Sequence, residues 1–188
     1  MNVQQILENI AAKKWHSIYF LAGDEPYFID KITTSLEAQV LSEEEKSFNQ
    51  AILYGSETDM QSVLAEARRY PMMAERVLVI VKEAQHLRKW ELLESYAENP
   101  QPSTILVFAH KHKKIDKRKK VFKQLQQKHL LLETKRLYDN QIPQWVKESL
   151  ESRGYPASTK ALHLIAESLG TDLARVENEL DKLSLILP

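Results

Sequence analysis

The sequence predicts an α/β protein in which a domain built on a parallel five-stranded sheet precedes a small helical-bundle domain. Short apolar runs of strand length alternate with segments of helical periodicity up to about residue 138. Beyond that point only helical periodicity remains. Alternating strands and helices are most economically connected as βαβ crossovers, which make the strands parallel and cover both faces of the sheet with helices.

The predicted elements of the first domain follow one another in a regular order. The strands are apolar runs bounded by turn or polar residues, at 18–21, 51–54, 77–81, 104–109 and 130–132. The helices carry apolar residues three and four positions apart, at 3–10, 26–40, 58–70, 87–97 and 117–127. Thr58 and Gln61 resemble a capping box at the start of one helix, and Pro71 is expected to end it.

The segment from residue 139 onward shows three helical stripes, at 142–150, 161–169 and 173–187, separated by Gly154 and Gly170. We therefore expect domains at 1–138 and 139–188. A bundle of about 50 residues buries too little surface to be stable alone, so it should pack on its neighbour or on a missing segment. The chain stops at Pro188, directly after an apolar helix, which we interpret as a cut from a longer protein.

The composition excludes several classes of protein. The 188 residues are 43% hydrophobic, contain no cysteine, and balance 26 Lys and Arg against 26 Asp and Glu. These values fit a packed core and argue against disulfide-stapled, fibrous and disordered chains. The apolar runs are too short to span a bilayer and no signal peptide is recognisable, so we expect a cytoplasmic protein with no membrane partner.

The turn after the first predicted strand is where an α/β protein of this type would bind a nucleotide. The turn and the helix after it, residues 23–32, read GDEPYFIDKI, with one glycine and no Lys-Ser or Lys-Thr pair. Asp24 and Glu25 would satisfy the helix N-terminus themselves and repel a triphosphate. Lys82 and Glu83 stand after a later strand, where a nucleotidase would offer Asp-Glu.

These residues favour a non-nucleotide-binding relative of an ATPase, with no cofactor, no metal and no catalytic residues. His110 and His112 lack the spacing of a metal site and are expected in a solvated loop. An active ATPase remains the alternative, and it would be distinguished by a rise in melting temperature with ATP.

A basic stretch at residues 110–123 concentrates positive charge, +7 in fourteen residues. It could track the phosphates of a nucleic acid or serve as a solvated face, and a nucleic-acid-binding module stays a second alternative. Asp116 is its only acid, and its Lys and Arg residues are Lys111, Lys113, Lys114, Lys117, Arg118, Lys119, Lys120 and Lys123.

The segment RRYPMMAER, residues 68–76, is the other unusual feature. Pro71 biases Tyr70 away from helix, and adjacent Met72 and Met73 cannot both lie on one narrow buried stripe. Taken alone, two methionines at a junction are more typical of core than of a binding surface, although methionine also suits adaptable binding surfaces.

Four segments, in order and together covering nearly the whole chain, resemble the delta-subunit family of the bacterial DNA polymerase III clamp loader. They are YFLAGDEPYFIDKI, RRYPMMAERVLVIVKEAQ, KKIDKRKKVFK and DLARVENELDKLSLIL. The resemblance implies an AAA+-type fold, with a RecA-like α/β domain and a small helical domain. It also implies that the family's third domain, the C-terminal collar, is absent here.

The resemblance further implies a non-ATPase subunit of a DNA-directed DNA polymerase holoenzyme, a transferase complex of DNA replication. Such a subunit binds the sliding clamp, the beta subunit, and opens the ring for loading onto primed DNA. Its implied partners are the clamp, the other subunits of a hetero-oligomeric loader, held mainly through the missing C-terminal domain, and primed DNA.

The implied clamp-binding residues are the adjacent pair Met72 and Met73, flanked by Tyr70 and Pro71. Family members commonly carry leucine and phenylalanine in such a pair, and two methionines depart from that pattern. The basic stretch is expected to add modest electrostatic attraction to DNA or to a partner.

Overall fold

The structure is a computed structural model that describes residues 1–186. It divides into two compact units, Met1–Lys135 and Arg136–Pro188, which are described separately. The predicted third helical stripe includes Leu187, which, like Pro188, lies outside the described residues.

The first unit is built on a sheet of five parallel strands in the order β2-β3-β4-β1-β5. In β1, Ile18 lies opposite Leu106 of β4, and Tyr19 lies opposite Leu130 of β5, so the first strand is internal. The predicted parallel α/β fold is confirmed. The strands are β1 (Ile18–Gly23), β2 (Gln50–Tyr54), β3 (Val77–Lys82), β4 (Thr104–Lys111) and β5 (Leu130–Thr134).

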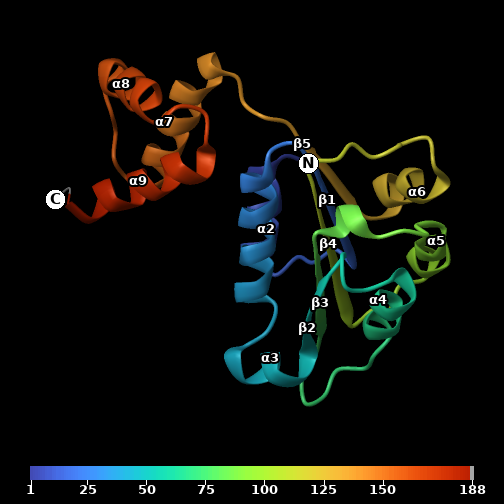
Figure 1. Cartoon of the computed structure of the whole chain (residues 1–188). Coiled ribbons are helices and arrows are strands. Elements are labelled where there is room, and N and C mark those ends of the chain that lie inside the picture. The colour runs from blue at the N-terminus through green and yellow to red at the C-terminus, as the bar shows by residue number, and fades with distance from the viewer. Residues whose placement is uncertain (187–188) are drawn as a thin grey trace. The chain divides into compact units, whose positions relative to one another are not determined.

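Helices cover both faces of this sheet, as parallel strands require (Figure 1). One hydrophobic core lies under α1 (Val3–Ala11) and α2 (Pro26–Gln39). A second core lies on the opposite face under α4 (Met60–Ala67), α5 (Glu91–Glu98) and α6 (Lys120–Lys128). β1, β3 and β4 are almost entirely buried between the two helical layers.

A short helix that the sequence interpretation did not include, α3 (Glu43–Asn49), lies between α2 and β2. Ser42 and Glu45 form its capping box, in which the Glu45 N–H and the Ser42 hydroxyl are 3.4 Å apart and the Ser42 N–H donates to the Glu45 carboxylate at 2.8 Å. Two glutamates between them fill the first helical turn and favour it electrostatically.

Several predicted helix starts are wrong by a few residues. The N-cap of α4 is Asp59, whose carboxylate accepts from the Ser62 N–H at 2.8 Å, so the capping box of Thr58 and Gln61 does not form. The predicted helix at 87–97 begins only at Glu91, after a 3-10 turn, η1 (Ala84–His86). At α4 the Asp59 cap sets the start of the helix, whereas Trp90, at the N-cap of α5, makes no side-chain capping bond.

The second unit contains α7 (Ile142–Ser152), α8 (Thr159–Leu169) and α9 (Leu173–Ile186), after a 3-10 turn, η2 (Asp139–Gln141). Each helix contributes buried residues from its apolar stripe, for example Val146, Leu162 and Val176. The predicted helical bundle is therefore confirmed as the second part of the fold.

In residues 1–186, none of the helices combines the length and the apolar character that crossing a membrane would require.

Candidate functional site

The segment between α4 and β3 forms an exposed turn that holds the predicted clamp-binding residues. The helix before it ends earlier than predicted, at Ala67 rather than at Pro71, because the Arg68 N–H is shared between the Leu64 and Ala65 carbonyls at 3.1 and 3.3 Å. Such sharing tightens the last helical turn and ends the helix. The chain then has nine residues, 68–76, in which to turn before β3.

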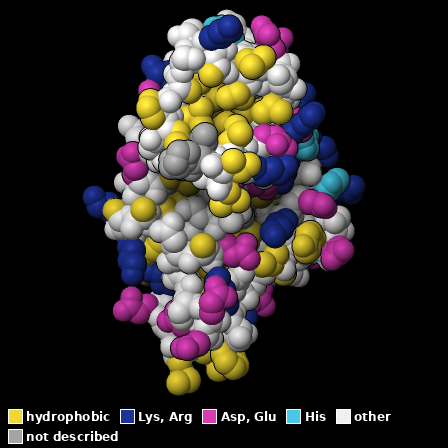
Figure 2. Space-filling view, turned by 90° about the vertical axis from the view of Figure 1, so that its left-hand side faces the viewer, with side chains coloured by type: hydrophobic (Ala, Val, Ile, Leu, Met, Phe, Trp, Pro, Cys, Tyr) yellow, Lys and Arg dark blue, Asp and Glu magenta, His cyan; other side chains and the backbone are white. Residues whose placement is uncertain are grey.

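Apolar side chains project from this turn into solvent. Met72 is 55% exposed, while Met73 is fully exposed and has a positive φ of 53°. A left-handed backbone costs a non-glycine residue about 1–2 kcal/mol. Tyr70 is also exposed, and so is Phe48 near the end of α3. We call Phe48, Tyr70, Met72 and Met73 the apolar tip, and hydrophobic side chains stand out at the lower end of the view in Figure 2.

The end of α3 lies directly against this turn. The buried Asn49 side chain accepts from the Met72 N–H at 2.7 Å and donates to the Met72 carbonyl at 2.9 Å. The Arg69 guanidinium donates to the Phe48 carbonyl at 3.3 Å, which satisfies a last-turn carbonyl of α3. Sequence reasoning missed both Phe48 and Asn49, and the one signal in the sequence was the Ser42–Glu45 capping box that starts their helix.

The turn after β1 is filled by the protein's own groups. The Thr134 hydroxyl donates to the Glu25 carbonyl at 2.9 Å and lies 3.2 Å from the Ala22 carbonyl. The Asp24 N–H donates to the Thr134 carbonyl at 3.1 Å. The buried Glu25 carboxylate caps α2 by accepting from the Tyr27 N–H at 3.2 Å. A phosphate would have to displace this carboxylate from the helix N-terminus.

Lys82 and Glu83, at the end of β3, stand where a nucleotidase would have Asp-Glu, and both contact other residues of the first unit. The Lys82 carbonyl accepts from the Gly55 N–H at 2.8 Å. The Ser56 hydroxyl donates to the Glu83 carboxylate at 3.2 Å. Glu83 has a positive φ of 54°, which turns its backbone away from the strand direction. These contacts connect the loop after β2 with the end of β3.

The expectation that His110 and His112 lie together in a solvated loop is wrong for His110. His110 belongs to β4 and is buried against the rings of Phe20 and Trp90, while His112 is exposed. Its Nδ1 has no hydrogen-bond partner among the residues that the structure describes. Within that same range, no cluster of three or more His, Asp or Glu residues could hold a metal ion.

Burial lowers the pKa of His110 below its ordinary 6.5, and the charge of nearby Lys113 lowers it too. The folded state therefore binds fewer protons than the unfolded state, and stability is lost as the pH falls from about 6.5 through the lowered pKa. His110→Phe should reduce the slope of the unfolding free energy against pH between pH 7 and 5, by at most about 1.4 kcal/mol per pH unit.

Urea denaturation at several pH values measures this slope. His163→Gln is the matched control, because it removes a histidine whose side chain is exposed rather than buried. Some slope should remain in the His110 variant, since burial also lowers the pKa of His16. A wild-type slope in His110→Phe would contradict the assignment.

Four of the eight Lys and Arg residues in the basic stretch pair with acids of the first unit. Lys111 pairs with Asp30 at 2.6 Å and Lys120 with Glu94 at 3.3 Å. Lys117 and Arg118 pair with Glu133 and Asp116, and Lys113 donates to the Gln85 carbonyl at 3.3 Å. Over residues 1–186, the side chains of Lys114, Lys119 and Lys123 make no hydrogen bond or ion pair and are exposed.

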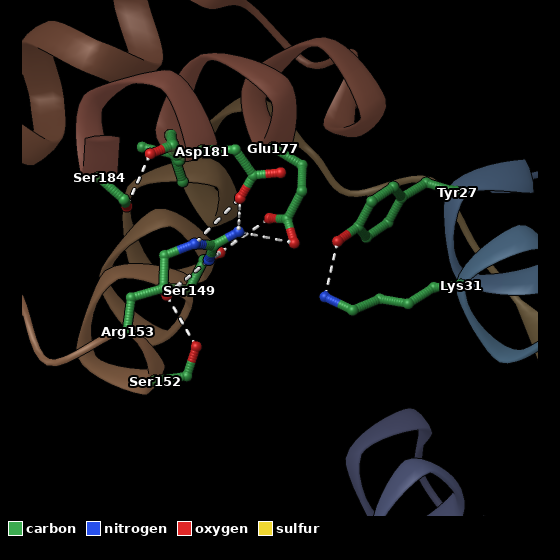
Figure 3. Close-up of polar contacts among 9 residues, drawn as sticks. Tyr27, Lys31, Ser149, Ser152, Arg153, Glu177, Asp181 and Ser184 are labelled. Carbon is green, nitrogen blue, oxygen red and sulfur yellow. Dashed lines mark hydrogen bonds and ion pairs between the residues drawn. The ribbon is translucent and has the colours of Figure 1, made fainter. Parts of the chain in front are cut away.

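In the second unit, the main polar cluster surrounds Arg153 at the end of α7 (Figure 3). Its guanidinium pairs with Glu177 at 3.0 Å and with Asp181 at 2.7 Å, both on α9. It also donates to the Ser149 carbonyl at 2.8 Å. The Ser149 hydroxyl in turn donates to Glu177 at 2.8 Å. These contacts join α7 to α9, so the cluster has a structural role.

The sequence and the structure were compared with those of known proteins, and the family match lies within the first unit. Residues 19–135 match the family described as "DNA polymerase III, delta subunit". Over 178 residues the chain is 28% identical to the DNA polymerase III subunit delta of Bacillus subtilis (strain 168), covering 89% of this chain and 51% of that protein.

A solved structure, the Bacillus subtilis DNA clamp loader delta protein, matches with a TM-score of 0.86 and 25% sequence identity. The match covers 98% of this chain and 57% of that chain. The chain thus spans about half the length of the relatives it matches.

Proposed function

The chain belongs to the family of DNA polymerase III delta subunits, and we propose that it is the clamp-loader subunit that binds the sliding clamp and opens the ring for loading onto primed DNA. The observation that carries this proposal is the exposed methionine pair at the apolar tip. Large apolar side chains gathered on a protruding turn are typical of a contact with another protein. Methionine adapts its shape to an apolar pocket.

We propose further that the subunit acts without hydrolysing ATP and is not itself an enzyme. The turn after β1 supports this, because the Thr134 carbonyl accepts from the Asp24 N–H and the Glu25 carboxylate accepts from the Tyr27 N–H. Backbone N–H groups of this kind are the ones with which such a turn would hold phosphate. Energy for clamp loading would then come from other subunits, and this chain would contribute binding energy.

The remaining partners in this proposal are the other subunits of a hetero-oligomeric loader in the cytoplasm. The chain spans about half the length of its relatives, and we expect assembly with these subunits to depend mainly on the family's C-terminal collar domain. Primed DNA would be met only in the assembled loader.

The decisive measurement is the dissociation constant between this chain and the purified sliding clamp of the same organism. Binding that is lost when the apolar tip is truncated supports the proposal. Absence of binding by the folded wild-type chain contradicts it.

Direct DNA binding through the basic stretch is the second candidate function, and three exposed lysines favour it: Lys114, Lys119 and Lys123. Since the neighbouring basic residues already have partners, we expect only a modest contribution. Replacing all three by Gln should reduce the salt slope of primed-DNA binding by the assembled loader by at most about 3.

Filter binding over a range of salt concentrations measures this slope. Replacing the exposed Lys14, Lys135 and Lys160 by Gln makes the same change in net charge elsewhere and is the control. Equal slopes for the two triple variants would show that the basic stretch is a solvated surface with no specific role in DNA binding.

A further inference from the structure

Asn49 makes a two-point contact with the backbone of the apolar tip. Its side-chain oxygen accepts from the Met72 N–H at 2.7 Å, and its Nδ2 donates to the Met72 carbonyl at 2.9 Å. The same Nδ2 donates to the Glu45 carbonyl at 3.1 Å inside α3. Asn49 is only 3% exposed, so water cannot readily replace these bonds. Both backbone polar groups of Met72, its N–H and its carbonyl, are therefore hydrogen-bonded to the Asn49 side chain.

The residue after this contact has the strained backbone of the tip. Met73 has a positive φ of 53° and projects fully into solvent. A strained conformation persists only where the surrounding structure fixes it. The side chain of Met73 is too exposed to do so, and the nearest fixed point is the amide of Met72, held by Asn49.

We infer that Asn49 is a positioning residue for clamp binding, which holds the tip in its outward conformation before the clamp arrives. This inference rests on the proposed function. A preformed tip avoids the entropy cost of ordering the turn during binding. The contact between Asn49 and the Met72 backbone should therefore increase the affinity for the clamp. Asn49 itself need not touch the clamp.

The chemistry of asparagine is specifically required here. Only an amide offers both an acceptor for the Met72 N–H and donors for the Met72 and Glu45 carbonyls. Aspartate would lose both donated bonds, and alanine would lose all three.

The test is a double-mutant cycle on the dissociation constant for the purified sliding clamp. Asn49→Ala should weaken binding about tenfold. In a chain that already carries Met72→Ala and Met73→Ala, the same substitution should have almost no further effect, because there is no side-chain pair left to position. A merely structural role would weaken both backgrounds equally.

The matched control is Ser42→Ala, which removes the cap at the other end of α3 and leaves the Asn49 contacts in place. It should lower the melting temperature and leave clamp affinity unchanged. An equal loss of affinity in this variant would overturn the inference, since destabilising α3 alone would then suffice.

Failure of the inference and failure of the proposed function give different results. If the double methionine variant loses affinity and Asn49→Ala does not, only the positioning role is wrong. If the double methionine variant binds normally, the tip is not the clamp contact and both are wrong.

A measurement on the wild-type chain applies even if Asn49→Ala folds poorly. The Met72 amide hydrogen should exchange slowly in the free protein, because it donates to a buried acceptor. Exchange at the rate of an unprotected amide would overturn the inference.

Discussion

Replacing Met72 and Met73 together by alanine should weaken binding to the sliding clamp by about thirtyfold or more. Burying a methionine side chain in an apolar pocket contributes roughly 1.5 to 3 kcal/mol, so the pair should account for about 2 to 5 kcal/mol after the alanine methyl groups are allowed for. Both side chains are exposed in the free chain, and their loss should leave the melting temperature nearly unchanged.

Two controls separate binding from folding in this experiment. Met60→Ala truncates a buried methionine of α4 and should lower the melting temperature, by the cost of a core cavity. Tyr54→Ala truncates an exposed apolar side chain outside the tip and should leave clamp affinity intact. A well-folded double methionine variant with wild-type affinity would refute the assignment of the tip.

Replacing Gly23 by alanine should destabilise the first unit by about 4 kcal/mol or more. Gly23 has a φ of 132°, and a Cβ there would lie 2.0 Å from the carbonyl oxygen of Thr134 and 2.7 Å from its nitrogen. Since both atoms are backbone, β5 would have to move away from β1. That movement would also break the bond from the Asp24 N–H to the Thr134 carbonyl.

Gly154→Ala isolates the cost of a positive φ from the cost of the steric clash. Gly154 has a φ of 82°, and a Cβ there would meet no heavy atom within 4 Å, so its replacement should cost only about 1–2 kcal/mol. Amide hydrogen exchange measured in β1 and in α7 reports the stability of each unit separately. Equal losses for the two variants would show that the contact with Thr134 is unimportant.

The sequence predicted the order and type of most elements because the apolar periodicity is strong where both faces of a parallel sheet are buried. It did not predict α3, since that helix is short and charged, with Asn49 as its buried residue. Helix starts were displaced where a single local bond decided them, as with Asp59 at the start of α4.

The candidate site was only partly visible in the sequence. Met72 and Met73 were selected by resemblance to the clamp-loader family, since two methionines at a junction, taken alone, are more typical of core than of a binding surface. Their exposure depends on the positive φ of Met73 and on contacts with residues more than twenty positions earlier, Phe48 and Asn49. Local patterns do not encode such tertiary contacts.

The internal position of β1 has a consequence for how this chain folds during synthesis. Its two neighbours are β4 and β5, which begin about 85 to 110 residues later in the chain. The strand is fully buried in the folded protein. At a synthesis rate of roughly 5–20 residues per second, several seconds pass after β1 is made before its first partner strand is made. Completion of the sheet is therefore a late event on the ribosome, and a nascent chain halted before residue 130 would leave one edge of β1 open to unwanted pairing.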